Sequence, residues 1–112
     1  MRISATPISR HELLLMAPAD LLGFWFSKNS EPHWFDSTSA FDAQVRTSFE
    51  DLWRQACDGQ MMPWEATPDG ALALVILLDQ MPLNMFRDQP EGYSTEALSR
   101  EVAGRAIARG FD

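Results

Sequence analysis

Residues 71–78 are all apolar, and the pattern around them predicts a helix. The run Ala-Leu-Ala-Leu-Val-Ile-Leu-Leu contains no polar position, so a helix built from it has no hydrophilic face. Such a helix must be covered by protein on every side. We therefore expect residues 71–78 to lie at the centre of an all-helical core.

Both ends of this helix are marked by the sequence. Thr67 can cap the first turn with its hydroxyl, and Pro68 suits the first helical position, where the N–H that proline lacks would have no partner. At the other end, Pro82 has no N–H to donate to the carbonyl of Leu78 and biases the preceding residue away from helical angles. The helix should stop or kink near Gln80.

Apolar residues spaced by three and four predict further helices, and short links between helices predict an all-α fold of antiparallel helical hairpins with about four main helices. Residues 1–16 are expected to be irregular, and residues 17–112 to form a single helical domain. The other main helices are expected over residues 18–26, 40–58 and about 94–109, with a helical turn at 61–64 and stops at Gly59 and Gly110.

The core is expected to lie where the second and third helices pack antiparallel to each other. Its expected members are Leu21, Trp25, Phe41, Val45, Phe49, Leu52, Leu72, Val75, Ile76 and Leu78.

A candidate polar cluster follows the apolar helix and consists of Asp79, Gln80, Asn84 and Arg87. Asp79 is unusual, because a carboxylate in the last turn of a helix faces the negative end of the helix dipole. We expect it to have a partner, either Arg87, Arg46 or backbone N–H groups near Pro82. The cluster either fixes the kink structurally or forms a ligand-binding site, because buried polar groups must be satisfied in both cases.

The four tryptophans divide into two pairs. Trp25 and Trp53 fall on apolar stripes and are assigned to packing, whereas Trp34 and Trp64 lie in connections and could form the rim of a groove.

Several of these residues together resemble the bacterial family called domain of unknown function 924. The resemblance covers about residues 19–112 and rests on Phe24-Trp25-Phe26, Trp34-Phe35, Phe41-Asp42-Ala43, Arg46, Gly59, Trp64, Thr67-Pro68, Leu78-Asp79-Gln80-Met81-Pro82 and Asn84. The resemblance implies a tetratricopeptide-repeat-like helical fold but does not indicate any activity. Leu83 stands where family members usually carry arginine, which weakens an anion site, and members continue for several more helices. The resemblance therefore implies the N-terminal part of a longer family domain.

Charge and composition restrict the possible partners and location. The chain has 112 residues, a formal net charge of −7 and a pI near 4.6, so nucleic acid and anionic membranes are not expected partners. No apolar run is long enough for a signal peptide or a membrane span, and the one cysteine, Cys57, suits a reducing compartment. We expect a cytoplasmic protein in which Cys57 is a buried, inert thiol.

No cofactor or metal site is expected from the motifs. The chain has no glycine-rich phosphate loop and no zinc-binding spacing. Glu31, His33 and Asp36 carry suitable ligand atoms, but they lack the helical spacing that preorganises a metal site.

Two functions stay open, with a non-enzymatic role favoured. The first is a helical scaffold that binds a protein or peptide through a groove. The second is a small-molecule or hydrolytic site built on the Asp79, Gln80, Asn84 and Arg87 cluster. The last helix adds a further expectation, because besides its stripe of Leu98, Val102 and Ile107 it carries four more alanines. Few of its residues are then left to face water: Ser99, Arg100, Glu101, Arg105 and Arg109. We expect an uncovered apolar groove between the third and fourth helices, which later family helices or a second copy of the chain would cover.

Overall fold

The computed structural model describes residues 16–111 and is all-α in that range, with no strand among those residues. The expectation of an irregular segment over residues 1–16 lies outside the described part except for Met16, which is not helical. The helices are α2 (Pro18–Trp25), α3 (Ser39–Cys57), α4 (Pro68–Asp79), α5 (Met81–Met85) and α6 (Glu96–Ala108), with 3-10 turns η1 (Glu31–His33), η2 (Met62–Ala66) and η3 (Pro90–Tyr93).

Local capping explains where these helices begin and end. The Thr67 hydroxyl accepts from the backbone N–H of Gly70 at 3.0 Å, as the sequence predicts. Thr38 caps α3 in the same way by accepting from Phe41 N at 3.1 Å. Gly59 and Gly110 follow α3 and α6 with φ of +78°, a left-handed conformation that glycine adopts without strain. The predicted boundaries are confirmed to within a few residues.

Pro82 produces a kink between α4 and α5. α4 ends at Asp79, Gln80 keeps right-handed helical angles (φ −86°, ψ −48°), and α5 begins at Met81. The missing N–H of Pro82 leaves the Leu78 carbonyl without its usual helical donor. The Thr95 hydroxyl donates to that carbonyl at 2.6 Å instead.

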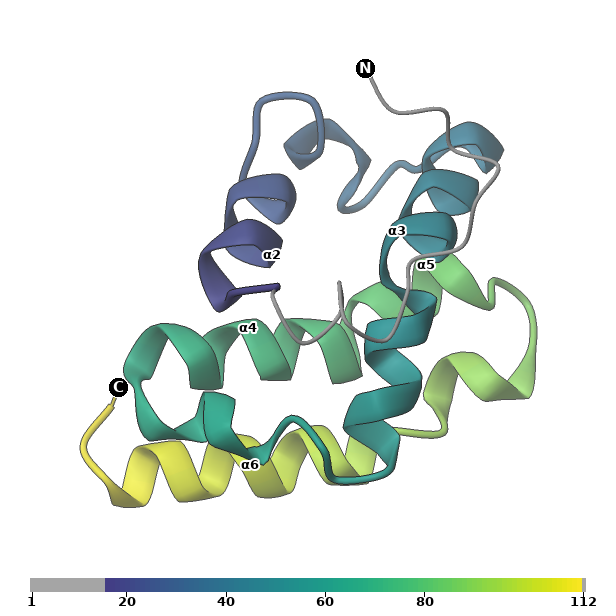
Figure 1. Ribbon diagram of the computed structural model, residues 1–112. Coiled ribbons are helices and arrows are strands. Elements are labelled where there is room, and N and C mark those ends of the chain that lie inside the picture. Colours follow the sequence, from purple (N-terminus) through teal and green to yellow (C-terminus); the bar gives the residue numbers. More distant parts are fainter. Residues whose placement is uncertain (1–15, 112) are drawn as a thin grey trace.

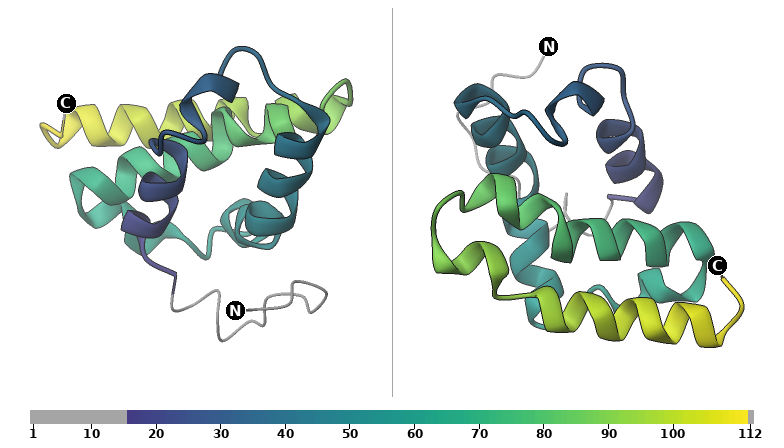
Figure 2. Two further views of the ribbon diagram at one scale, coloured as in Figure 1. Left: turned by 90° about the horizontal axis from the view of Figure 1, so that it is seen from above. Right: turned by 180° about the vertical axis from the view of Figure 1, so that it is seen from behind.

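α4 lies at the centre of the described structure and packs most extensively against α6. The two helices run antiparallel and side by side, while α2 lies across the opposite side of α4 (Figures 1 and 2). The expected antiparallel pairing of α3 with α4 is wrong: α3 crosses α4 steeply and contacts α5 more than α4 (Figure 1). The kink turns α5 toward α3, so the apolar stripe of α3 packs over the α4–α5 junction.

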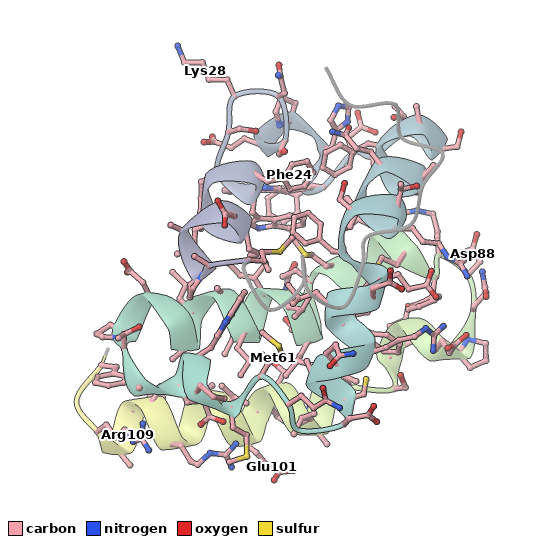
Figure 3. The ribbon with its side chains drawn as sticks, viewed as in Figure 1. Phe24, Lys28, Met61, Asp88, Glu101 and Arg109 are labelled. Carbon is pink, nitrogen blue, oxygen red and sulfur yellow. The ribbon has the colours of Figure 1, made fainter. Side chains whose placement is uncertain are left out.

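The core is largely the predicted one and is rich in aromatic rings. Phe24 points into the space between α2 and α3 (Figure 3), where its ring lies 5.8 Å from that of Phe41 and 5.1 Å from that of Phe49. The prediction fails for Leu72, which is 45% exposed, and Val75 is only partly buried. α4 is therefore not covered on every side, because no described helix lies over the face that carries Leu72.

Polar contacts near both of its ends join α6 to the rest of the fold. Near its start, Thr95 Oγ1 accepts from Trp53 Nε1 at 3.2 Å while donating to Leu78, which links three helices through one buried hydroxyl. Near its end, Arg105 forms a bidentate pair with buried Glu65 of η2, at 2.8 Å and 3.0 Å. Thr95 thus fixes the start of α6 beside the end of α4, and Arg105 fixes the later part of α6 beside η2.

We predict that Thr95→Val destabilises the protein markedly. The substitution removes a hydroxyl and leaves the Trp53 indole and the Leu78 carbonyl unpaired in the core, at about 1–3 kcal/mol for each unpaired group. Chemical denaturation measures the change. Ser94→Ala is the matched control, because that exposed hydroxyl donates only to the Glu91 carbonyl, and its loss should cost less than about 1 kcal/mol. Equal stability of the two variants would contradict this role of Thr95.

Gly70 provides a second test, at the contact between η2 and α4. A Cβ at this position would lie 1.9 Å from the Trp64 carbonyl oxygen, so Gly70→Ala must push η2 away from α4. We predict a loss of about 1–3 kcal/mol in the free energy of unfolding. Gly104→Ala is the control, because its Cβ meets open space inside the exposed part of α6, and a gain of about 0.5–1 kcal/mol is expected. A stability gain at both positions would show that η2 does not approach α4 closely.

Candidate functional site

The predicted polar cluster divides into two separate groups in the structure. Asn84 and Arg87 bind Asp42 of α3, whereas Asp79 accepts from the side chain of Gln80 at 2.6 Å. The expected pairing of Asp79 with Arg87 is therefore wrong. The kink at Pro82 turns the α5 side chains toward the first turn of α3 and away from Asp79.

Asp42 is the centre of the first group, and its carboxylate is surrounded by donors. Arg87 donates from Nε at 2.6 Å and from Nη2 at 3.1 Å, Asn84 from Nδ2 at 2.9 Å, and Ser37 from its hydroxyl at 2.8 Å. Burial raises the pKa of Asp42, but the hydrogen bonds from Arg87, Asn84 and Ser37 outweigh it, and the net shift is downward. A carboxylate held in this way is a structural anchor between α3 and α5 and a poor general base.

Sequence reasoning did not assign Asp42 a role. One signal was present, because Asp42 lies in the first turn of a helix, where the dipole favours a carboxylate, beside the apolar position Phe41. That signal identifies a good position for an acid but not its partners, which lie 42 and 45 residues later in the chain.

Arg46, the other expected partner of Asp79, is also bound elsewhere. It donates from Nε to Glu50 at 2.8 Å and from Nη1 to the Met85 carbonyl at 3.4 Å, and it lies over the Phe86 ring. The Arg46 guanidinium thus covers the end of α5 and pairs with Glu50 rather than with Asp79.

Trp34 and Trp64 both pack against the core. Trp34 donates from Nε1 to the Trp25 carbonyl at 3.0 Å and stacks on the Trp25 ring. Trp64 is half-buried, and its carbonyl touches the backbone of α4 at Gly70. Neither indole lines the cavities described below, so a rim role for either residue stays a prediction.

Among residues 16–111, no group of three histidine, cysteine or acidic side chains is placed to hold a metal ion. His33 stacks on Phe41 with ring centroids 4.6 Å apart, and its Nδ1 lies 3.4 Å from the Asp36 carbonyl. The described part likewise contains no helix that could cross a bilayer.

Cys57 differs from the expectation of a buried thiol, because its side chain is exposed. It borders a cavity of about 110 Å³ between the end of α3, η2 and α6. Desolvation by the surrounding protein and the negative charge of Asp58 raise the pKa of the thiol. The protonated thiol is a weak nucleophile, so the expected lack of reactivity still follows from this environment.

A second cavity adjoins Arg87, beyond the end of α5. It measures about 150 Å³ and is lined by Leu83, Phe86, Arg87, Asp88, Gly92 and Tyr93. Asp88 adopts a left-handed φ of 63° and lies at the outer edge of the connection between α5 and η3 (Figure 3). Asp79, Gln80 and Asn84 do not line this cavity, so the predicted cluster does not converge on it.

The uncovered apolar face expected between the third and fourth helices is present between α4 and α6. We call it the α4/α6 groove; its volume is about 210 Å³, and every residue lining it is apolar. Leu72 on one side is 45% exposed and Ile107 on the other is 59% exposed. Ser99, which was expected to face water, is buried on α6 instead. The residues lining the groove are Pro68, Ala71, Leu72, Val75, Ala103, Ala106, Ile107 and Phe111.

Comparisons with known proteins identify relatives but no activity. A family model described as "Bacterial protein of unknown function (DUF924)" matches residues 21–112. The solved structure of a protein of unknown function from Agrobacterium tumefaciens is similar, with 37% sequence identity and a TM-score of 0.79. The match covers 84% of this chain and 53% of that one, so the chain spans about half the length of this relative. No curated protein matches the chain.

We predict that Asp42→Asn weakens the fold at neutral pH, by about 1–3 kcal/mol, because it removes charge-assisted hydrogen bonds. The pKa of Asp42 is lowered by folding, so its contribution is present above the unfolded value of about 4 and is lost as pH falls through the lower folded value. The difference between wild type and variant in denaturant titrations should therefore shrink as the solution is acidified from pH 7 to about pH 3.

The control for this experiment is Asp36→Asn, a change to an exposed loop carboxylate, which should alter stability by less than about 0.5 kcal/mol. A stability difference between wild type and Asp42→Asn that stays constant with pH would contradict the assignment.

Proposed function

Since the chain belongs to the DUF924 family of bacterial proteins of unknown function, we propose a function from its own geometry. We propose that it is a helical scaffold that binds an amphipathic segment of a protein in the α4/α6 groove. The observation that carries this proposal is the wholly apolar lining of a groove with two half-exposed aliphatic side chains at its centre. The chain is rich in charged residues, with a net charge of −7, yet every residue that lines this groove is apolar.

The shape of the groove suits a helix. Two antiparallel helices form a shallow channel between their side chains, and a third helix can lay apolar residues at i, i+3, i+4 and i+7 into it. α4 has 12 residues and is therefore about 18 Å long, which matches roughly three turns of a bound helix. Covering the exposed halves of Leu72 and Ile107 would contribute about 1 kcal/mol each.

The alternative function, a small-molecule or hydrolytic site on Asp79, Gln80, Asn84 and Arg87, has less support. A general base needs a free carboxylate with a raised pKa beside a space for substrate. Asp42, which lies at the centre of the group formed with Arg87, accepts four hydrogen bonds, and its pKa is lowered. The two halves of the predicted cluster also face different elements.

The proposed location is the cytoplasm. The single cysteine needs no oxidising compartment for its exposed thiol, and a peptide-binding scaffold with this acidic charge suits a reducing, protein-rich environment.

We predict that Leu72→Glu and Ile107→Glu each abolish binding to the groove without unfolding the protein. The probe is a labelled amphipathic helix of about 14 residues with a leucine stripe, followed by fluorescence anisotropy. Wild type should bind it saturably and should also enhance the fluorescence of a hydrophobic dye, whereas both glutamate variants should lose both signals. The variants should change the free energy of unfolding by less than about 1 kcal/mol, because both positions are half exposed.

Phe35→Glu is the matched control, because Phe35 is 97% exposed and lies in the loop before α3, away from the groove. It should leave both signals unchanged. Wild-type protein that neither binds the helix nor enhances the dye would overturn the proposed function.

A further inference from the structure

Asp79 lies on the same face of α4 as the groove. Helical residues separated by three, four and seven positions share one stripe, so Leu72, Val75 and Asp79 follow one another along α4. Leu72 and Val75 line the groove, and Asp79 is the next residue along the same stripe, at the C-terminal end of the helix. The Asp79 carboxylate therefore lies at one end of the apolar wall that Leu72 and Val75 form.

The environment of Asp79 leaves its charge poorly compensated. It stands at the negative end of the α4 dipole, and the hydrogen bond it accepts comes from the neutral amide of Gln80, at 2.6 Å. The arginines expected to neutralise it bind other carboxylates: Arg87 binds Asp42, and Arg46 binds Glu50. A half-buried carboxylate in this position favours an additional cation.

α6 contributes a second carboxylate, Glu96, at the same end of the groove. Thr95 donates to the Leu78 carbonyl, which places the start of α6 beside the end of α4. By the same helical spacing, Glu96, Arg100, Ala103 and Ile107 form one stripe of α6, and its last two members line the groove. Arg100 is 72% exposed and lies 3.7 Å from Glu96. This end of the two helices therefore carries two carboxylates, Asp79 and Glu96, and one arginine, which leaves it acidic.

We infer that the α4/α6 groove takes an amphipathic helix that carries lysine or arginine at the end lying over Asp79 and Glu96. This inference rests on the proposed function and specifies the partner by its charge. The apolar stripe of the bound helix covers Leu72, Val75, Ala103 and Ile107, and its cation supplies the charge that Asp79 lacks within the described fold.

A single helix fits this surface better than a second copy of the chain. Stable dimer interfaces cover about 800 Å² on each subunit. The groove is about one helix long and has two half-exposed large apolar side chains, Leu72 and Ile107, so it offers much less area than such an interface needs. Two copies would also each bring a net charge of −7 and the same acidic end to the contact.

The test compares three labelled helices of about 14 residues that share one leucine stripe and differ only at the terminal turn, which carries lysine, glutamine or glutamate. Anisotropy titrations should rank affinity as lysine, then glutamine, then glutamate, with about two- to fivefold between neighbours at low salt. Asp79→Asn should remove most of the lysine preference while keeping binding of the glutamine helix. Asp69→Asn, at the opposite end of α4, is the matched control and should preserve the ranking.

The outcomes separate this inference from the proposed function. Equal affinity for the three helices, with binding still lost in Leu72→Glu, would overturn the charge inference and leave the proposed function intact. Failure of all three helices to bind would overturn both. A dimer in sedimentation that Leu72→Glu dissociates would assign the groove to a second copy and would also overturn the inference.

Discussion

The fold depends on how the carbonyl of Leu78 is satisfied. Pro82 kinks the most buried helix and removes the N–H that would have bonded to this oxygen. A carbonyl left unpaired in an apolar core is costly, so another donor has to reach it. Thr95, the residue just before α6, supplies that donor, and its oxygen in turn accepts from Trp53 of α3. One hydroxyl therefore fixes the relative positions of α3, α4 and α6.

Two carboxylates, Asp42 and Glu65, also join elements of the fold. Asp42 with its donors ties α3 to α5, and Glu65 with Arg105 ties η2 to α6. Folding lowers the pKa of both carboxyls; for Glu65 the hydrogen bonds from Arg105 are the main cause, and burial opposes them. The well-formed ion pairs thus hold the frame together, and the surface between α4 and α6 is left apolar. These ion pairs and the lining of the α4/α6 groove are formed by different residues.

Features that depend on neighbouring residues were predictable from the sequence. The Thr67 cap, the Pro82 kink and the left-handed Gly59 each follow from the chemistry of a few adjacent positions. Pairings between distant residues were not: Arg87 is nearer to Asp79 in sequence, but the kink directs it to Asp42, 45 residues away. The apolar pattern of residues 71–78 likewise shows no hydrophilic face, yet it cannot show that one face, at Leu72, is uncovered. The missing information was the direction in which the chain turns after each helix.

The bond between Thr95 and Leu78 also bears on how the chain folds during synthesis. The chain emerges from the ribosome N-terminus first, so α4 emerges before Thr95 does. Until then the Leu78 carbonyl has no donor from α6, and α4 lacks the helix that covers it most extensively. The first helices can form locally during translation, but the core closes only when the start of α6 arrives. During that interval the nascent chain exposes its most apolar helix, which is the stage at which a chaperone would have most to bind.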